Sequence, residues 1–318
     1  MPEQTCSVVV DNLRKQFGSF VAVEQLNLKI PKGEVFGFLG PNGAGKSTTI
    51  RMLCGLLKPT SGRASVAGFD VGRNPEQVRQ NIGYMSQKFS LYNDLKVIEN
   101  LRLFAGLYSV PSNSLKERIE WALQMANLKG QENLITGTLP GGWKQRLALG
   151  CAVLHKPPIL FLDEPTSGVD PITRHQFWDL IHQMASEGVT VFVTTHYMEE
   201  AEYCNRLALI FRGKIVALGT PSELKHNFMT GELLLIECQP LGTAVEALQQ
   251  APDVMDAAVF GNALHLVVRD AAAAIPSITK FLESRGVTLS RIEKIRPTLE
   301  DVFVSLTTNR GTDEGGKP

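Results

Sequence analysis

Residues 40–48 decide the fold, and they read Gly40-Pro41-Asn42-Gly43-Ala44-Gly45-Lys46-Ser47-Thr48. The first eight match the pattern GxxxxGK(S/T) of a phosphate-binding loop, with an apolar strand predicted at 34–39 before it and a helix at 46–56 after it. The glycines let backbone N–H groups close around β- and γ-phosphates at the positive end of the helix. Lys46 is expected to neutralise phosphate charge, and the Ser47 hydroxyl to bind Mg²⁺. The loop therefore predicts a nucleotide site.

A second stretch, a continuous apolar strand predicted at 159–162, ends in two carboxylates, Asp163 and Glu164. Ligands of α/β sheets bind at the carboxyl ends of the strands. Asp163 is expected to hold Mg²⁺ directly or through water, and Glu164 to orient and deprotonate an attacking water. Read alone, the pair has a less favoured alternative, a strand that ends in a solvated acidic turn. The phosphate loop upstream favours catalysis.

The segments around these motifs alternate between strands and helices. Apolar and polar residues alternate at 20–30, which indicates a half-buried strand, and a β-branched strand is predicted at 189–195. Residues 111–130 show helical spacing behind an expected capping box of Ser114 and Glu117, and helices are also predicted at 100–108 and 143–155. Strands alternating with helices predict a parallel, doubly wound sheet.

Beyond about His226 the pattern changes to a compact α+β appendage without a catalytic constellation. It has predicted strands at 233–238, 254–260, 263–268 and 289–295, and helices near 244–250 and 274–285. We therefore predict a first domain at 1–225, a second at 226–308 and a flexible tail at 309–318. No internal repeat is visible.

Composition limits the classes of function. Lysine plus arginine and aspartate plus glutamate both number 32, so no global basic field recruits nucleic acid, and no nucleic-acid partner is expected. The five cysteines lie far apart, without metal-ligand spacing, which suggests a reducing compartment. The N-terminal residues do not resemble a secretory signal, and no run of about 18 apolar residues occurs. Any membrane role is expected to come through a partner.

Further motifs carry a resemblance to a known family. Leu139-Pro140-Gly141-Gly142-Trp143-Lys144-Gln145-Arg146 resembles the LSGGQ-type signature of ABC ATPases, and Ser167-Gly168-Val169-Asp170 resembles their D-loop. Gln87 fits the Q-loop, His196 the switch histidine, and Phe17 the aromatic residue that stacks on adenine. The match covers about 8–225. Six motifs in the family's order are far more specific than any one of them.

The resemblance implies an α/β P-loop NTPase fold of the ABC ATPase type. It has a parallel sheet core, an antiparallel N-terminal β part, a helical subdomain at about 88–155 and a small C-terminal α+β domain. It also implies ATP binding and hydrolysis. Gln87 would reach Mg²⁺ and the attacking water, His196 the γ-phosphate, and the nucleotide contacts would include Gly141, Gly142 and Asp170. Read singly, Gln87 and His196 are more often structural residues, and Phe17 could be a core aromatic.

The same resemblance implies partners. Two copies, or this chain and a paralogue, would hold two ATP molecules between the phosphate loop of one subunit and the signature of the other. The helical insertion would receive an integral membrane permease and place the chain at the cytoplasmic face of the membrane. Residues 163–171 and 297–303 resemble exporter ATPases of the daunorubicin-resistance kind. This implies export of a drug, lipid or other small molecule.

Two alternatives remain. A non-transport ABC ATPase acting on ribosomes or DNA repair complexes is disfavoured by the single phosphate loop, the absence of a heptad run and the zero net charge. A regulator that hydrolyses poorly is suggested by Pro140 alone, which stands where the signature usually has serine. Proline has neither a hydroxyl nor an N–H group to offer a phosphate.

Overall fold

The computed structural model describes residues 6–87, 91–229, 231–251 and 253–311. The chain divides into two compact units, Met1–Leu218 and Gly219–Pro318. This division lies seven residues before the predicted one at 225, so the helix that opens at Pro221 groups with the second unit. Each unit is described by itself below.

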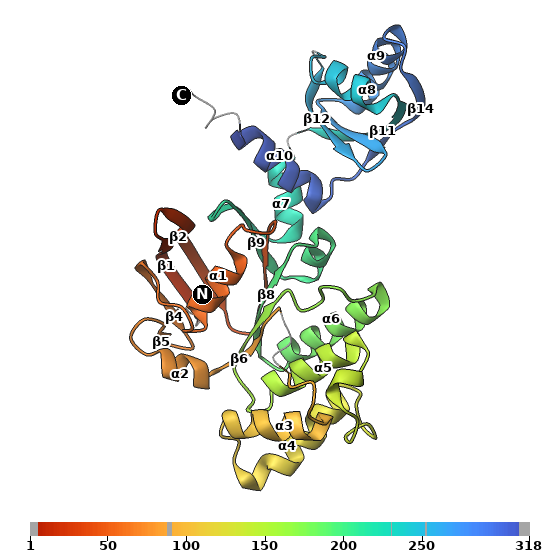
Figure 1. Cartoon of the computed structure of the whole chain (residues 1–318). Helices are drawn as coiled ribbons and strands as arrows, with labels where there is room; N and C mark the ends of the chain where they lie inside the picture. The colour runs from red at the N-terminus through yellow and green to blue at the C-terminus, as the bar shows by residue number, and fades with distance from the viewer. Residues whose placement is uncertain (1–5, 88–90, 230, 252, 312–318) are drawn as a thin grey trace. The chain divides into compact units, whose positions relative to one another are not determined.

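A six-stranded sheet forms the centre of the first unit (Figure 1). Its order is β10-β9-β3-β8-β7-β6, and the pairs β3/β8, β3/β9, β7/β8 and β6/β7 are parallel. The strands are β3 (Val35–Leu39), β6 (Ile82–Met85), β7 (Ile159–Asp163), β8 (Thr190–Thr195), β9 (Arg206–Phe211) and β10 (Lys214–Gly219). Every residue of β3, β7 and β8 is buried, as expected where both faces of a parallel sheet are covered. The predicted parallel core is confirmed.

A second, antiparallel sheet comes from the N-terminal part of the chain, as predicted. Its order is β2-β1-β4-β5, with β1 (Cys6–Phe17), β2 (Phe20–Pro31), β4 (Ser61–Val66) and β5 (Phe69–Asp70). The helices α1 (Lys46–Leu53) and α2 (Pro75–Gln80) belong to the same part. One hydrophobic cluster joins this sheet to the parallel one, and at its centre the ring of Phe192 lies 5.5 Å from those of Phe38 and Phe161. This packing holds the two sheets together around α1.

A helical region lies beside the parallel sheet (Figure 1). It contains α3 (Val97–Leu107), α4 (Ser112–Met125), a short 3₁₀ turn (Thr136–Thr138) and α5 (Gly141–Ala152). α6 (Pro171–Ser186) and the 3₁₀ segment η2 (Met198–Tyr203) follow. A second hydrophobic cluster packs these helices against the sheet. Residues 88–90 of the predicted helical subdomain lie outside the described residues.

The helix predicted at 100–108 begins three residues earlier, at Val97, and two further helix starts are displaced by prolines. α4 begins at Ser112 because Pro111 has a preset φ of −58°, and the Ser114 hydroxyl donates to the Pro111 carbonyl instead of forming the predicted capping box. α5 begins at Gly141 rather than Trp143. Pro140 is its N-cap, and the Pro140 carbonyl accepts from the N–H groups of Trp143 and Lys144 at 3.0 and 3.1 Å.

The second unit contains an antiparallel sheet in the order β12-β13-β11-β14. The strands β11 (Glu232–Gln239), β12 (Val254–Phe260), β13 (Ala263–Val268) and β14 (Thr288–Ile295) alternate with α8 (Leu241–Leu248) and α9 (Ala271–Ser284). Both helices contribute to one apolar core with the sheet. α7 (Pro221–Phe228) contacts α10 (Leu299–Gly311). The predicted α+β domain is confirmed.

α10 reaches Gly311, so the first residues of the predicted tail, 309–311, are helical. Residues 312–318 of that tail lie outside the described residues. Among the helices that the structure describes, none combines the length and the apolar character needed to cross a bilayer.

Candidate functional site: a phosphate-binding loop and its acidic strand

The phosphate loop joins the end of β3 to the start of α1, and its glycines are sterically required. A Cβ on Gly40 would lie 2.2 Å from the carbonyl oxygen of Ile210. Gly45 has φ +107°, and a Cβ there would lie 2.5 Å from the Ala22 carbonyl oxygen. No side chain caps the N-terminus of α1. The loop therefore brings bare backbone to the positive end of a helix, as the phosphate-site prediction requires.

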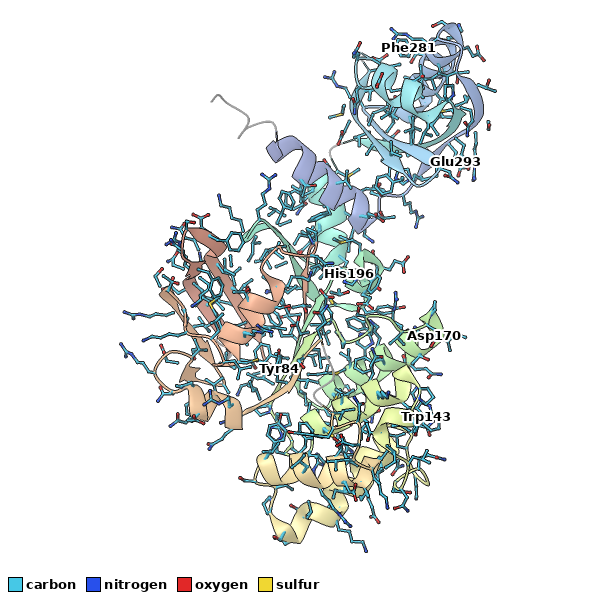
Figure 2. The ribbon with its side chains drawn as sticks, viewed as in Figure 1. Tyr84, Trp143, Asp170, His196, Phe281 and Glu293 are labelled. Atoms are coloured by element: carbon cyan, nitrogen blue, oxygen red, sulfur yellow. The ribbon has the colours of Figure 1, made fainter. Side chains whose placement is uncertain are left out.

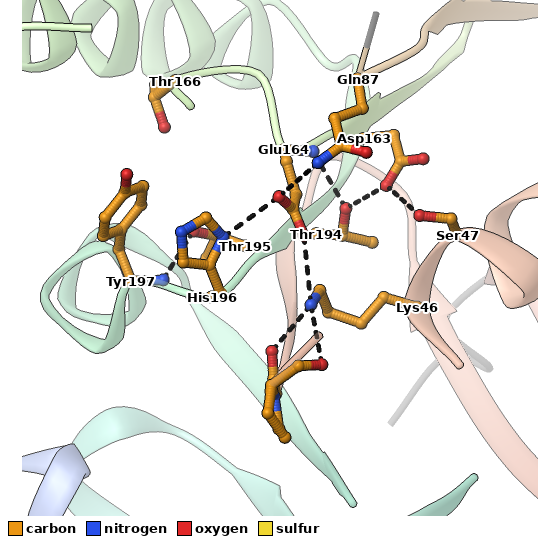
Figure 3. Close-up of polar contacts among 12 residues, drawn as sticks. Lys46, Ser47, Gln87, Asp163, Glu164, Thr166, Thr194, Thr195, His196 and Tyr197 are labelled. Carbon is orange, nitrogen blue, oxygen red and sulfur yellow. Dashed lines mark hydrogen bonds and ion pairs between the residues drawn. The ribbon is translucent and has the colours of Figure 1, made fainter. Parts of the chain in front are cut away.

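Lys46 lies at the bottom of this loop, only 4% exposed. Its Nζ donates to the carbonyl oxygens of Gly40 and Pro41 at 2.7 and 3.1 Å and lies 3.1 Å from Glu164 Oε1 (Figure 3). A buried ammonium must be paired, and these three oxygens hold it in place. The loop and the acidic strand are thus joined by an ion pair between the two residues predicted to bind phosphate and to act as base.

Asp163 is the last residue of β7. Its Oδ1 accepts from the Ser47 hydroxyl at 3.1 Å and from the Thr194 hydroxyl at 2.6 Å. Burial raises the pKa of nearby Tyr84 to about 12, and the Asp163 carboxylate contributes second. The sequence prediction missed Thr194. The register of the parallel strands could have revealed it, because Thr194 is the direct partner of Asp163 in the β7/β8 pair.

Glu164 adopts a left-handed backbone conformation with φ +49°, which non-glycine residues seldom adopt. Its N–H donates to the carbonyl and the hydroxyl of Thr194, both at 3.0 Å, and these bonds hold the strained turn. The side chain reaches Gln87 Nε2 at 2.9 Å and His196 Nδ1 at 3.1 Å, both through Oε2 (Figure 3). Strain at such a position is typical of functional sites. The structure therefore brings together Gln87, Glu164 and His196.

A pocket of about 410 Å³ opens over the loop. Its lining residues are Phe20, Ala22, Asn42, Gly43, Gly45, Lys46, Ser47, Thr48, Gln87 and Glu164. Gly40, Pro41 and Ala44 belong to the loop but do not line the pocket. The carbonyl oxygens of Gly40 and Pro41 accept from Lys46 Nζ, while Ala44 is buried and its N–H donates to the Pro41 carbonyl.

Phe20 is the aromatic residue among the described residues that line the pocket, and the adenine contact of Phe17 stays a prediction. Phe20 lines the pocket with 62% of its surface exposed. Phe17, its cross-strand partner in the β1/β2 hairpin, is absent from the described lining and has the Lys15 ammonium 4.9 Å from its ring centre. The pattern Lys15-Gln16-Phe17-Gly18 led to Phe17. The sequence could not show which of the two hairpin phenylalanines faces the loop.

The signature and D-loop residues lie elsewhere in the first unit. Among the described residues that line the pocket, none comes from α5 or α6. Gly141 is exposed at the first turn of α5, and a Cβ on Gly142 would lie 2.4 Å from Thr173 Cγ2. Figure 2 labels Asp170, which precedes α6. Asp170 caps this helix by accepting from the Thr173 N–H at 3.0 Å, and this hydrogen bond lowers the pKa of Asp170. Within one chain, then, Gly141, Gly142 and Asp170 do not join the site.

The residues present fit a nucleotide with Mg²⁺. The glycine cradle and the uncapped helix offer N–H donors, and Lys46 offers a positive charge. The Ser47 hydroxyl and the Asp163 carboxylate are hard oxygen ligands side by side. Mg²⁺ commonly takes one or two carboxylates together with substrate phosphates rather than a full protein cage. No group of three or more histidine, cysteine or acidic side chains suited to a metal occurs in the described part of the chain.

Comparison with known proteins agrees with this geometry. A family model described as ABC transporter matches residues 23–167, and one described as ATP-binding protein DrrA1-3-like, C-terminal domain, matches 219–307. The chain is 54% identical over 220 residues to the probable multidrug ABC transporter ATP-binding protein YbhF of Escherichia coli, covering 69% of this chain and 38% of that protein. It therefore spans well under half of YbhF.

Another relative matches over nearly its full length. The Nod factor export ATP-binding protein I of Cupriavidus metallidurans is 36% identical over 308 residues, covering 95% of this chain and 98% of that protein. Among solved structures, a dimeric structure of the ABC transporter cassette MJ0796 superposes with a TM-score of 0.62 at 28% identity, covering 67% of this chain and 98% of that one. The chain therefore belongs to the family of ABC transporter ATP-binding proteins, with a C-terminal domain of the DrrA1-3-like type.

Proposed function

We propose that the chain binds ATP with Mg²⁺, hydrolyses it, and uses the free energy to drive export through a separate membrane permease. The observation that carries the proposal is the cluster in which Lys46 and His196 both contact Glu164 beside the Ser47/Asp163 pair. A carboxylate held next to a phosphate loop by Lys46 of α1 and by Gln87 and His196, which follow β6 and β8, suits activation of water for attack on a γ-phosphate.

Each residue has a role in this proposal. Loop N–H groups and Lys46 would bind the phosphates, and Ser47 with Asp163 would hold Mg²⁺, which when bound would supply positive charge that stabilises the transferring phosphate. Phosphate oxygens compete with Glu164 for the Lys46 ammonium, so phosphate binding frees a carboxylate oxygen to accept a proton from water. Gln87 and His196 orient Glu164 from the side away from Lys46.

Assembly is the second part of the proposal. Gly141, Gly142 and Asp170 do not line the pocket of their own chain, so they act on the nucleotide of a second subunit, either a copy or a paralogue. The dimeric cassette structure supports this arrangement. The helical region around α3 and α4 would receive the permease and place the chain at the cytoplasmic face of the membrane. The names of the relatives, multidrug and Nod factor export, support an exported small molecule.

The experiment has two arms. Purified chain should hydrolyse ATP only with Mg²⁺, and chain expressed with its native membrane partners should co-purify with a polytopic membrane protein. ATP hydrolysis without membrane association would support a non-transport ATPase instead. Absence of Mg²⁺-dependent hydrolysis in the wild-type complex would contradict the catalytic proposal.

Phe20 is expected to contribute more than Phe17 to nucleotide affinity. Base-aromatic stacking is worth about 1–3 kcal/mol, so Phe20→Ala should weaken ATP binding by about 5- to 150-fold at 1.4 kcal/mol per tenfold. Phe17→Ala, the matched control from the same hairpin, should change affinity by less than about threefold. Calorimetric titration of both variants measures this. The reverse ranking would return the adenine contact to Phe17.

Pro140→Ser is expected to strengthen the ATP-dependent dimer. Serine restores a hydroxyl donor toward a phosphate of the opposite subunit, and such a charged hydrogen bond contributes about 1.5–3 kcal/mol. The same hydroxyl oxygen can cap α5, whose N-terminus no side chain caps now, adding about 1 kcal/mol to its stability. The gain should appear in dimerisation rather than in monomer affinity for ATP.

Sedimentation of Pro140→Ser with Mg-ATP in a Glu164→Gln background measures that gain. An opposing effect comes from losing the φ of −55° that proline fixes at position 140. The loop becomes more flexible, and this costs a fraction of the free energy gained in dimerisation. Unchanged or weaker association would mean that the glycine amides of α5 already satisfy the phosphate.

A further inference from the structure

A buried carboxylate that the proposed mechanism does not use lies beside the site. Glu200 belongs to η2, four residues after His196, and is 0% exposed. Its Oε1 accepts from the Thr166 hydroxyl and lies 3.5 Å from Arg174 Nε. Its Oε2 has no hydrogen-bond partner among the described residues. Glu199, the preceding residue, is exposed.

The two partners of Glu200 come from the segment of chain between β7 and the first turn of α6. Thr166 lies two residues after Glu164, in the turn that follows β7, and Arg174 lies in the first turns of α6. Arg174 Nη2 also makes a long contact of 3.5 Å to the Val169 carbonyl oxygen, which precedes the N-cap of α6. Glu200 therefore ties the turn at 164–170 to the segment that carries His196.

An aromatic contact completes the connection. The Arg174 guanidinium lies 4.2 Å from the ring centre of Tyr197, whose ring centre lies 4.1 Å from that of His196. The Tyr197 N–H donates to the Thr195 hydroxyl at 3.0 Å, so the backbone leaving β8 is also held. Figure 3 shows Tyr197 beside His196, on the side of the imidazole away from Glu164. Displacement of Arg174 would thus be felt at His196.

We propose that Glu200 is a positioning residue for ATP hydrolysis, which through Thr166 and Arg174 holds Glu164 and His196 in register with each other. The inference rests on the proposed ATPase function. A contribution to stability alone explains the arrangement poorly, since buried ion pairs often stabilise a fold no more than apolar side chains of similar volume. Its place between the two segments that carry Glu164 and His196 is explained by positioning, because misplacement of reacting groups by about 1 Å can cost about 10²-fold in rate.

The test compares Glu200→Gln and Thr166→Val with the control Glu199→Gln, which removes the same charge one residue away at an exposed position. For both test variants we expect kcat to fall about tenfold, while the dissociation constant for ATP changes less than about twofold. Glu199→Gln should match the wild type. Because Thr166 and Glu200 act through one contact, the double variant should be about as slow as either single variant. Thr166→Ser, which keeps the hydroxyl, should recover the lost rate.

A second readout does not depend on turnover. The imidazole C–H resonance of His196, assigned by its loss in His196→Gln, should shift in Glu200→Gln and Thr166→Val. Either change alters how Glu200 holds Arg174, which packs on the Tyr197 ring beside His196. The resonance should stay in place in Glu199→Gln. The chain has six histidines, so the spectrum is simple enough to assign.

Three results would overturn the inference: unchanged kcat in the folded test variants, an unmoved His196 resonance, or equal effects in Glu199→Gln. If kcat, ATP affinity and melting temperature all fell together in the test variants, Glu200 would likewise have a merely structural role. If the wild type itself does not hydrolyse ATP, the proposed function fails, and the His196 resonance alone then decides whether Glu200 holds the two segments in register.

Discussion

Glu164→Gln is expected to lower the rate of ATP hydrolysis by about 10²–10⁴-fold, the range typical of a lost general base. The amide keeps the shape of the side chain but cannot take a proton from water. It can still accept from Gln87 Nε2 and contact His196, so the strained turn at Glu164 should persist. ATP binding should survive, since Lys46 loses a competitor for phosphate. The variant should therefore accumulate as an ATP-bound dimer.

Single-turnover kinetics and size-exclusion chromatography with Mg-ATP measure both parts of this expectation. Glu199→Gln is again the charge-matched control, because its exposed side chain contacts none of the site residues named above. A Glu164→Gln protein that turns over ATP at the wild-type rate and elutes as a monomer would place the base elsewhere. Slow turnover without a trapped dimer would support Glu164 as the general base but contradict the proposed ATP-bound dimer.

Most of the fold followed from local pattern. The continuous apolar runs of β3 and β7, bounded by loop residues, and the switch to helical spacing around α4 were sufficient to predict these elements. Helix starts were less accurate, since Pro111 and Pro140 act as N-caps and shift the starts of α4 and α5 toward the N-terminus. Whether a proline acts as the N-cap depends on the backbone conformation around it, which the pattern of apolar residues does not reveal.

The site residues that belong to sequence motifs at the carboxyl ends of strands could be predicted. Lys46 and Ser47 open the helix that follows β3, while Asp163 ends β7 and Glu164 follows it. β8 separates these two parallel strands, but their carboxyl ends lie at one edge of the sheet, where ligands bind, so the motifs implied proximity. Thr194 required the β7/β8 register, and Phe20 required knowing which hairpin residue faces the loop. Glu200 was hidden altogether, because its partners Thr166 and Arg174 lie 34 and 26 residues away, and its function depends on burial.

Lys46→Ala is expected to weaken ATP binding by about 10²–10³-fold, because each charged hydrogen bond to a phosphate contributes about 1.5–3 kcal/mol. Two opposing effects act on this number. The wild type must first separate Lys46 from Glu164, 3.1 Å away, which reduces the net gain from the ammonium. The variant leaves Glu164, only 6% exposed, facing the phosphates without that cation, which adds repulsion. The second effect is larger, since an uncompensated buried charge costs about 3–5 kcal/mol.

The same reasoning separates affinity from stability. Lys46→Ala should lower the melting temperature in the absence of nucleotide, because Glu164 loses its strongest partner, whereas Lys46→Met/Glu164→Gln, which removes both charges and keeps the volume, should restore it. Nucleotide affinity should stay low in both, since neither offers a cation to the phosphates. Calorimetry with ATP and thermal unfolding of the two variants measure these quantities. Near-normal affinity in the double variant would mean that the backbone N–H groups at the start of α1 alone hold the phosphates, and Lys46 would then serve chiefly to neutralise Glu164.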